Sequence, residues 1–319
     1  MAMRLCSMSN IVDICVFIPH TGKAFAGSFL PGLLPFVFWF IQTSVFTQSE
    51  PKCADWLDTI ERNWIGVGAS ARIGDQRAQL TAPAAILSTV AARVDPYRLA
   101  SRLLRQMQQQ GTCVFDRTLE ESIKVDDDLV QLTSENGRTV RAKHLVVANG
   151  YEAQNWLKQS VAKNRSSYAY ITDPLDKREL GWLAHTMLWE SSRPYIYLRS
   201  TGDGRLLVGG EDDEYDIPSR RDRLVERKAA KLQRKVTRLF PQLQLKPAFA
   251  WAGTFAETID GLPLFGPHPQ YGPRVLFALA YGGNGITYSM LGAGLLRAHI
   301  EKKAHPLSEL FSFSRLETK

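Results

Sequence analysis

The stretch Tyr281-Gly282-Gly283-Asn284-Gly285-Ile286-Thr287 decides the fold class through the segments that flank it. It follows an apolar run at residues 275–280 and precedes residues 289–301, where four apolar residues recur at helical spacing: Leu291, Leu295, Leu296 and Ile300. This order predicts a strand, a tight turn and an amphipathic helix. A helix N-terminus offers free N–H groups and positive dipole charge, and glycines let a ligand approach the backbone. The turn is therefore predicted to hold a planar anionic ligand.

Four further segments accompany this turn: Val94-Asp95-Pro96-Tyr97-Arg98-Leu99, His144-Leu145-Val146-Val147-Ala148-Asn149-Gly150, Gly209-Gly210-Glu211-Asp212, and the block from Trp251-Ala252-Gly253-Thr254 through Asp260-Gly261-Leu262-Pro263-Leu264-Phe265-Gly266. Each alone is a weak signal, but their order and spacing are specific. From about residue 82 to residue 316 the chain resembles the FAD-dependent amine and amino-acid oxidoreductases. That group includes D-amino-acid oxidase, glycine oxidase, sarcosine oxidase and gamma-glutamylputrescine oxidase.

The resemblance implies an α/β (α+β) fold in two parts. An FAD-binding, Rossmann-like parallel sheet, incomplete at its N-terminus, would comprise residues 51–160 and 250–319. An antiparallel-sheet substrate domain would comprise residues 161–249, where apolar and aromatic residues alternate, as in Tyr168 and Tyr170, around a hairpin at Asp203-Gly204. Residues 1–50 would form an atypical apolar N-terminal segment.

The net charge of +7 is concentrated in residues 220–238, which hold nine Lys or Arg and two Asp or Glu residues. Apolar residues recur there at helical spacing, namely Val225, Leu232, Val236 and Leu239. We therefore expect a helix with one packed face and an opposite, solvated charged face. No aromatic residues are interleaved for base stacking, so nucleic acid is excluded as a partner.

The four cysteines, Cys6, Cys15, Cys53 and Cys113, form no CxxC pair and have no histidine at zinc spacing. Neither a disulfide framework nor a metal site is predicted, and a reducing cytoplasm is the expected location.

Residues 24–49 carry no charge and are densely apolar. About twenty apolar residues can span a bilayer, whereas Pro31, Pro35 and Gly32 weaken a helix. A membrane anchor, a signal-like segment and a locally buried or poorly folded segment are the alternatives, and the anchor is not favoured. If the segment spans a membrane, Arg4 and Lys23 would keep the N-terminus cytoplasmic.

This region is where the family carries a GxGxxG string that holds the FAD pyrophosphate. The nearest candidate, residues 66–71, reads GxGxxA but follows the polar Glu61-Arg62-Asn63 instead of an apolar strand. Alternatively, residues 68–74 are similar to a string that lies against the flavin phosphates after the family's second strand. In both cases the first mononucleotide-binding half is missing or replaced, which suggests a truncated or mis-started gene.

After residue 80 the elements are regular. Asp95-Pro96 predicts the start of a helix, and Gly111 predicts its end. Short strands are expected at residues 113–115, 122–125, 129–133 and 139–142, with a hairpin turn at Asn136-Gly137. The apolar run at residues 145–148 is expected to be a central strand that ends at a ligand.

The resemblance also implies the cofactor contacts. Residues Tyr281, Gly282, Gly283, Asn284, Gly285, Ile286 and Thr287 would face the N1 and C2 carbonyl side of the flavin, where negative charge develops when N5 accepts a hydride. Asn149 and Gly150 would lie beside the dinucleotide, with Asn149 where the family usually has Thr or Ser. Glu120, or alternatively Leu119, would lie near the adenine, and a Glu would contribute only its backbone.

The substrate contacts depart from the family. Amino-acid-oxidising relatives usually hold the substrate carboxylate with an Arg just before the Gly-Thr pair, a position that Trp251 occupies here. The second Arg position, found in glycine oxidases, is Gly283. An amine without an α-carboxylate, or a polyamine-like compound, is therefore favoured as the substrate over a simple α-amino acid, with Trp251, Tyr195 and Tyr197 as candidates for an aromatic wall that binds a cation.

The favoured function is FAD-dependent oxidation of the C–N bond of an amine or amino acid by hydride transfer to flavin N5. The alternatives are a catalytically silent, truncated remnant of this family and a membrane-anchored flavin dehydrogenase.

Overall fold

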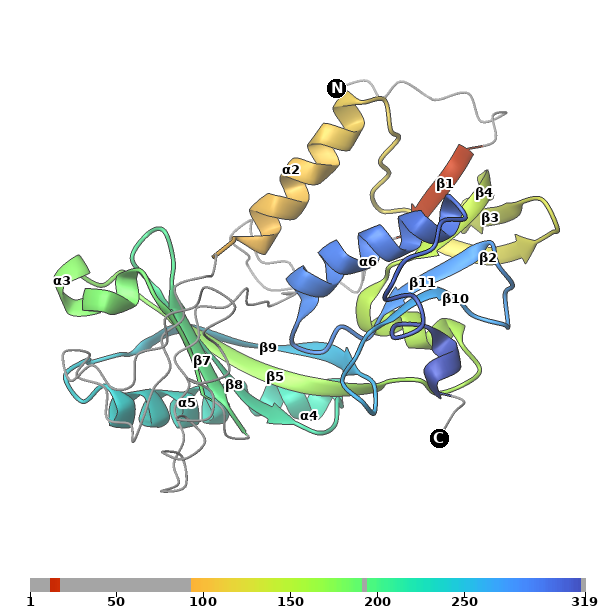
Figure 1. The fold of residues 1–319 in the computed structure, drawn as a ribbon. Coiled ribbons are helices and arrows are strands. Elements are labelled where there is room, and N and C mark those ends of the chain that lie inside the picture. The colour runs from red at the N-terminus through yellow and green to blue at the C-terminus, as the bar shows by residue number, and fades with distance from the viewer. Residues whose placement is uncertain (1–11, 18–92, 191–193, 317–319) are drawn as a thin grey trace. The chain divides into compact units, whose positions relative to one another are not determined.

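The computed structural model describes residues 12–17, 93–190 and 194–316 (Figure 1). The chain divides into two compact units. Among the described residues, the first unit contains residues 12–17, 94–163 and 255–316, and the second contains residues 93, 164–190 and 194–254.

The first unit is built on a mixed sheet with the strand order β10-β11-β4-β3-β2, in which β1 also pairs with β4. Its strands are β1 (Val12–Phe17), β2 (Glu120–Val125), β3 (Val130–Ser134), β4 (Thr139–Val147), β10 (Leu264–Pro267) and β11 (Val275–Leu279). Strand β4 is parallel to β1 and β11 and antiparallel to β3. The hairpin at Asn136-Gly137 is confirmed, because Gly137 has φ +75° and its N–H donates to the carbonyl of Ser134 at 2.8 Å.

Strands β4 and β11 form the centre of this unit. Leu145, Val147, Val275 and Phe277 are fully buried and belong to one core cluster, whereas Val146 and Leu276, which alternate with them, belong to another. The second cluster includes Leu295 and Leu296 of helix α6 (Gly285–Ile300). Because both faces of these strands are covered, their sequences are continuous apolar runs. The predicted strand, turn and helix at residues 275–301 are thus confirmed.

Helix α2 (Pro96–Gln109) begins as predicted, since the side chain of Asp95 accepts a hydrogen bond from the N–H of Arg98 at 3.0 Å and Pro96 occupies the first turn. None of its residues is buried, and Leu103 is 48% exposed. The strand predicted at residues 113–115 is wrong. The segment has no strand pairing, and Cys113 and Phe115 are exposed. A run of three apolar residues is too short to show whether a partner strand is within reach.

Three 3-10 helices complete the described elements: η2 (Gly150–Trp156) and η4 (Phe313–Leu316) in the first unit, and η3 (Gly181–Ala184) in the second.

The second unit is built on a sheet with the order β6-β7-β8-β5-β9. Its strands are β5 (Lys163–Thr172), β6 (Met187–Trp189), β7 (Ile196–Ser200), β8 (Leu206–Asp213) and β9 (Pro247–Glu257), and its helices are α3 (Lys177–Leu180), α4 (Pro218–Arg223) and α5 (Val225–Leu239). The pairs β5–β8, β6–β7 and β7–β8 are antiparallel, as predicted. The turn at Asp203-Gly204 is confirmed, with Gly204 at φ +82°.

One face of this sheet packs against α5. Leu232 and Val236 of the helix share a core cluster with alternate residues of the strands, namely Tyr168, Tyr170, Ile196, Leu198, Leu206 and Val208. The residues between them, including Tyr197 of β7, therefore lie on the opposite face.

The apolar side of helix α5 is buried as predicted. Its charged side is not simply solvated, which differs from the prediction. Lys231 and Lys235 form ion pairs with the buried Glu211 at 2.6 and 2.7 Å, and Lys228 pairs with Asp213 at 2.6 Å. These acids lie on β8. Part of the charge excess of residues 220–238 is thus neutralised by carboxylates of another element, strand β8.

Candidate functional site

Three parallel strands of the first unit end at the same edge of the sheet. Val147 at the end of β4 pairs with Phe17, the last residue of β1, and with Phe277 of β11. Asn149 follows β4, and Ala280 follows β11. In open α/β sheets, ligands bind outside the carboxyl ends of the strands, so this edge is the expected ligand site.

At the start of the predicted turn, just after this edge, two residues have a left-handed backbone conformation. Ala280 has φ +62° and Gly282 has φ +56°. The N–H of Gly282 donates to the carbonyl of Ala256 at 2.9 Å, and the N–H of Asn284 donates to the carbonyl of Tyr281 at 3.0 Å. Burial raises the pKa of the Tyr281 hydroxyl to about 12. The two backbone hydrogen bonds, from Gly282 and from Asn284, fix the conformation of the first half of the turn.

The second half of the turn leads into the uncapped start of helix α6. Asn284 makes no side-chain capping hydrogen bond, and the first turn contains no acidic residue. Helix α2, in contrast, is capped by Asp95, and helix α3 by Asp176. The first turn of α6 thus has neither a side-chain cap nor an acidic residue of its own, an arrangement that suits an anionic ligand atom.

Asn149 supplies an independent observation at the same edge. Its side chain is 8% exposed, and its Oδ1 atom is buried without a hydrogen-bond partner among the described residues. Gly150 follows with φ +62°. An unsatisfied buried acceptor costs about 1–3 kcal/mol, and a ligand hydroxyl or N–H would remove this cost. Asn149 therefore fits a contact with a polar ligand.

The structure does not bring Glu120 to this edge. Glu120 is the first residue of β2 and pairs with Ser134, next to Thr133, which pairs with Thr139 at the beginning of β4. It therefore lies at the opposite end of the sheet from Asn149. Glu120 is half-buried, and burial raises the pKa of its carboxyl to about 7, whereas Leu119 is exposed. A role of either residue near adenine stays a prediction.

The candidate substrate residues lie in the second unit. Tyr195 and Tyr197 have ring centroids 6.3 Å apart, and Trp189 contacts Tyr195 edge to face at 5.9 Å. Trp251 of β9 instead stacks on Phe249 at 5.8 Å. Strands β8 and β5 separate β9 from β7, a distance of about 14 Å at the usual strand spacing. The predicted aromatic wall thus consists of two separate groups of rings.

Sequence reasoning missed Trp189 and left Asp212 without a role. Burial and the charge of Asp212 both raise the pKa of the Tyr197 hydroxyl, while a hydrogen bond with Ser167 and the charge of Arg199 lower it. Trp189 pairs with Tyr197 across β6 and β7. The signal for Asp212 was the motif Gly209-Gly210-Glu211-Asp212, but the motif alone does not show which face of the strand each residue occupies.

The remaining site predictions can be compared only with the part of the chain that the structure describes. No cluster of His, Cys, Asp and Glu residues in the described ranges could hold a metal ion, and Cys113 is not part of a disulfide. None of the described helices is long and apolar enough to cross a bilayer. The apolar residues 24–49 and the glycine strings at 66–74 lie outside the described residues.

An edge where three parallel strands of a mixed sheet end, a glycine turn before a helix without a side-chain cap and a second, antiparallel sheet are features of a nucleotide-cofactor fold. The chain belongs to the family of FAD-dependent oxidoreductases, because the family model, described as "DAO: FAD dependent oxidoreductase", matches residues 37–298.

Curated relatives agree with this assignment. The chain is 28% identical to a glycine oxidase from Bacillus licheniformis over 199 residues, which cover 60% of this chain and 50% of the relative. It is 29% identical to a glycine oxidase from Geobacillus kaustophilus over 219 residues, which cover 68% and 55% of the two chains. The chain thus spans about half the length of the curated relatives it matches.

Solved structures share the fold. The crystal structure of glycine oxidase from Geobacillus kaustophilus matches with a TM-score of 0.69 and 20% identity, covering 87% of this chain and 76% of that one. L-proline dehydrogenase from P. horikoshii matches with a TM-score of 0.71 and 19% identity, covering 88% and 78%. The mixed α/β fold with two sheets is therefore confirmed.

Proposed function

We propose that the protein is an FAD-dependent oxidoreductase that oxidises the C–N bond of a small amine or amino acid. The observation that carries this proposal is the uncapped, glycine-rich start of α6 beside the unsatisfied Oδ1 of Asn149. Both features lie where the carboxyl ends of β4 and β11 meet. Family membership and the glycine oxidase relatives support the same cofactor and reaction class.

The chemistry that bound FAD would supply is a two-electron oxidation of the carbon that carries the substrate nitrogen. The N–H groups at residues 283–287 would stabilise negative charge on the isoalloxazine, because a helix start provides aligned donors in advance. Gly283 and Gly285 would let the ring approach without a side chain between. Asn149 would accept a hydrogen bond from the dinucleotide.

Within this reaction class we favour an amine over an α-amino acid. Trp251 and Gly283 occupy the positions where a carboxylate-binding Arg would be expected from the family resemblance. A carboxylate that loses water without a guanidinium partner is unfavourable, whereas aromatic side chains attract an alkylammonium group. Trp251, Tyr195 and Tyr197 are the candidate residues for that contact.

One observation favours a second candidate, a catalytically silent member of the family. Strand β1 is followed in the sequence by Ile18-Pro19-His20-Thr21-Gly22-Lys23, which is not a GxGxxG string. Without a pyrophosphate-binding turn, the protein would retain its fold and hold FAD weakly or not at all.

The visible absorption spectrum of the purified full chain tests the two candidates. Oxidised flavin absorbs blue light, so a yellow protein with stoichiometric flavin supports the enzyme. Supernatant flavin after denaturation would show that the cofactor is not covalently attached. A colourless protein that does not take up added FAD would contradict the proposal and support the silent member.

A further inference from the structure

Helix α2 carries an apolar face that the described part of the protein does not bury. None of its residues is buried, and none belongs to the three core clusters of the described residues. Tyr97, Leu103, Leu104 and Met107 are 37% to 48% exposed. In the described ranges, six of the twelve exposed large apolar residues lie between residues 97 and 119. Exposed apolar surface is thus concentrated in and just after this helix.

The sequence of α2 gives the helix one apolar and one basic face. At about 100° per residue, the large apolar side chains fall within a sector of about 160°: Tyr97, Leu99, Leu103, Leu104 and Met107. Three arginines fall within about 60° on the opposite side: Arg98, Arg102 and Arg105. The helix contains no acidic residue. Asp95, which caps the helix, lies 3.6 Å from Arg98, so the net positive charge is that of Arg102 and Arg105.

Helix α5 shows the same pattern used inside the protein. It is also basic on one side and apolar on the other, but its Leu232 and Val236 are fully buried in a core cluster. Its lysines form ion pairs with carboxylates of β8. In α2, in contrast, the leucines at 103 and 104 are exposed, and neither Arg102 nor Arg105 forms an ion pair within the described chain. Both faces of α2 are therefore available for a partner.

The length of α2 limits what that partner can be. A helix of 14 residues is about 21 Å long, which is too short to cross a hydrocarbon core of about 30 Å. With a face about 10 Å wide, two copies of α2 would bury about 400 Å² in total, less than the roughly 1,000 Å² of a stable dimer. A lipid surface needs neither the length nor a complementary shape, because an amphipathic helix can lie within the headgroup region.

We propose that α2 binds the surface of a membrane that contains anionic lipids and lies parallel to that surface. The four exposed apolar side chains, Tyr97, Leu103, Leu104 and Met107, enter the boundary between headgroups and acyl chains. Arg102 and Arg105 attract the anionic headgroups across the helix, whose diameter of about 10–12 Å is comparable to the screening length of about 8 Å at physiological salt. This contact is separate from the flavin reaction, so it does not depend on whether the protein holds FAD.

Co-sedimentation of the full chain with lipid vesicles tests the proposal. We expect binding to vesicles of phosphatidylcholine mixed with phosphatidylserine, weaker binding at raised salt, and weaker binding to phosphatidylcholine alone. Leu103→Glu should lower the affinity for the mixed vesicles about 10-fold or more, because it removes an inserted side chain and adds a charge. The matched control is Gln109→Glu, which adds the same charge on the arginine side of the same helix and should change the affinity by no more than about 2-fold.

Two further variants separate the apolar and the electrostatic contributions. Met107→Gln adds no charge and should lower the affinity about 3-fold, which covers the case in which Leu103→Glu does not fold. The double variant Arg102→Gln/Arg105→Gln should lower the affinity for the mixed vesicles about 5-fold and leave binding to phosphatidylcholine alone unchanged.

Two results would overturn the proposal. Equal vesicle binding by the wild type, Leu103→Glu and Met107→Gln would show that another part of the chain contacts the lipid. The second is an absence of vesicle binding together with a dimer of the wild type in sedimentation velocity that Leu103→Glu abolishes. That result would assign the apolar face of α2 to a second copy of the chain.

Discussion

Gly292 of helix α6 lies directly against the ring of Phe265 of strand β10, so that a Cβ atom at position 292 would overlap the ring. Phe265 cannot move away easily, because its ring also contacts Tyr281 and Phe311 at centroid distances of 5.7 and 5.9 Å. The helix that begins at the candidate flavin turn can therefore pack this closely on the sheet only because residue 292 has no side chain.

The first prediction concerns this contact. Gly292→Ala should destabilise the protein by about 1–3 kcal/mol, because overpacking a core shifts its neighbours. Gly294→Ala is the matched control in the same helix, since the nearest atom to its Cβ would be 3.9 Å away, on His305. Alanine there should stabilise the protein by up to about 1 kcal/mol. Chemical unfolding measures both, and equal effects would contradict the close contact.

The second prediction concerns the turn itself. Gly285→Val should reduce the flavin content of the purified protein several-fold, because Gly285 is buried at the helix start where the isoalloxazine would approach. Gly202→Val, at an exposed hairpin with no atom within 4 Å of its Cβ, should leave the flavin content unchanged. Flavin absorbance per protein chain provides the measurement. Equal flavin content in the two variants would refute the assignment of the turn.

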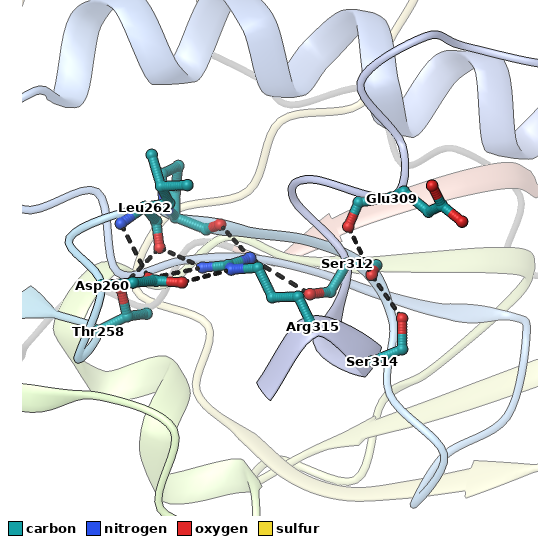
Figure 2. A network of polar contacts seen from close by, with 8 residues as sticks. Thr258, Asp260, Leu262, Glu309, Ser312, Ser314 and Arg315 are labelled. Carbon is teal, nitrogen blue, oxygen red and sulfur yellow. Dashed lines mark hydrogen bonds and ion pairs between the residues drawn. The ribbon is translucent and has the colours of Figure 1, made fainter. Parts of the chain in front are cut away.

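The third prediction concerns the network that ties the C-terminal helix η4 to the motif at residues 258–263 (Figure 2). Arg315 forms two contacts with the carboxylate of Asp260, at 2.9 and 3.2 Å, and donates to the carbonyls of Leu262 and Pro263. The side chains of Arg315 and Asp260 are only 12% and 23% exposed. Arg315→Met should therefore lower the free energy of unfolding by about 2–3 kcal/mol.

The same pair gives a pH dependence. The hydrogen bond from Arg315 holds the pKa of Asp260 well below its usual range, with Thr258 and the N–H of Leu262 contributing. A depressed folded-state pKa stabilises the protein above the unfolded-state value of about 3.9 and loses this effect as the pH falls through the folded-state value. The stability difference between wild type and Asp260→Asn should thus be constant from pH 7 to about 5 and shrink below that. A difference that grows on acidification would contradict the pairing.

The fourth prediction concerns substrate choice. Under anaerobic conditions, a diamine or an N-alkylamine should bleach the flavin faster than glycine, sarcosine or a D-amino acid at equal concentration. A carboxylate without a guanidinium partner loses several kcal/mol on desolvation, roughly 1,000-fold in affinity, which aromatic contacts do not offset. Stopped-flow absorbance gives the rates. Faster bleaching by any of the three amino acids would show that another cation, such as Arg199, binds the carboxylate.

The fifth prediction concerns the N-terminal residues. Strand β1 lies within the segment 1–50, which the sequence predicted to be atypical, and it pairs with β4 along five positions. Deletion of residues 1–49 would expose that edge of β4 to solvent and to other chains, so we expect aggregation. Deletion of residues 24–49 keeps β1 and provides the comparison. If both shortened chains are equally soluble, the pairing of β1 contributes little to the fold.

The sequence correctly predicted the elements that depend on a few neighbouring residues. The helix start at Asp95-Pro96, the turn at Asn136-Gly137 and the glycine turn before α6 depend on a few neighbouring residues, and all three are confirmed. Strand β1 was missed, although Val12, Ile14 and Val16 alternate as in a strand. The prediction instead described residues 1–50 as one atypical apolar segment.

Features that depend on distant partners were not accessible to sequence reasoning. The residues at 113–115 look like a strand but have no pairing in the described sheet. The lysines of α5 looked solvated, because the pattern of one helix does not show that Glu211 and Asp213 lie against it. The irregular pairing of β5 with β8 near Gly210 was likewise not predictable, because a pair of glycines does not show which face of the strand the following residues occupy. Asp212 could be placed only from the structure.

The parallel pairing around β4 also determines when the sheet can form. Val12 pairs with Ala142, and Leu145 pairs with Val275, so both contacts join residues about 130 positions apart in the chain. During synthesis, β1 leaves the ribosome long before β4 exists, and β4 then waits a similar time for β11. Long-range pairing of this kind slows folding and leaves strand edges open. The first unit therefore closes only when most of the chain has been made, and chaperone demand should be greatest during that interval.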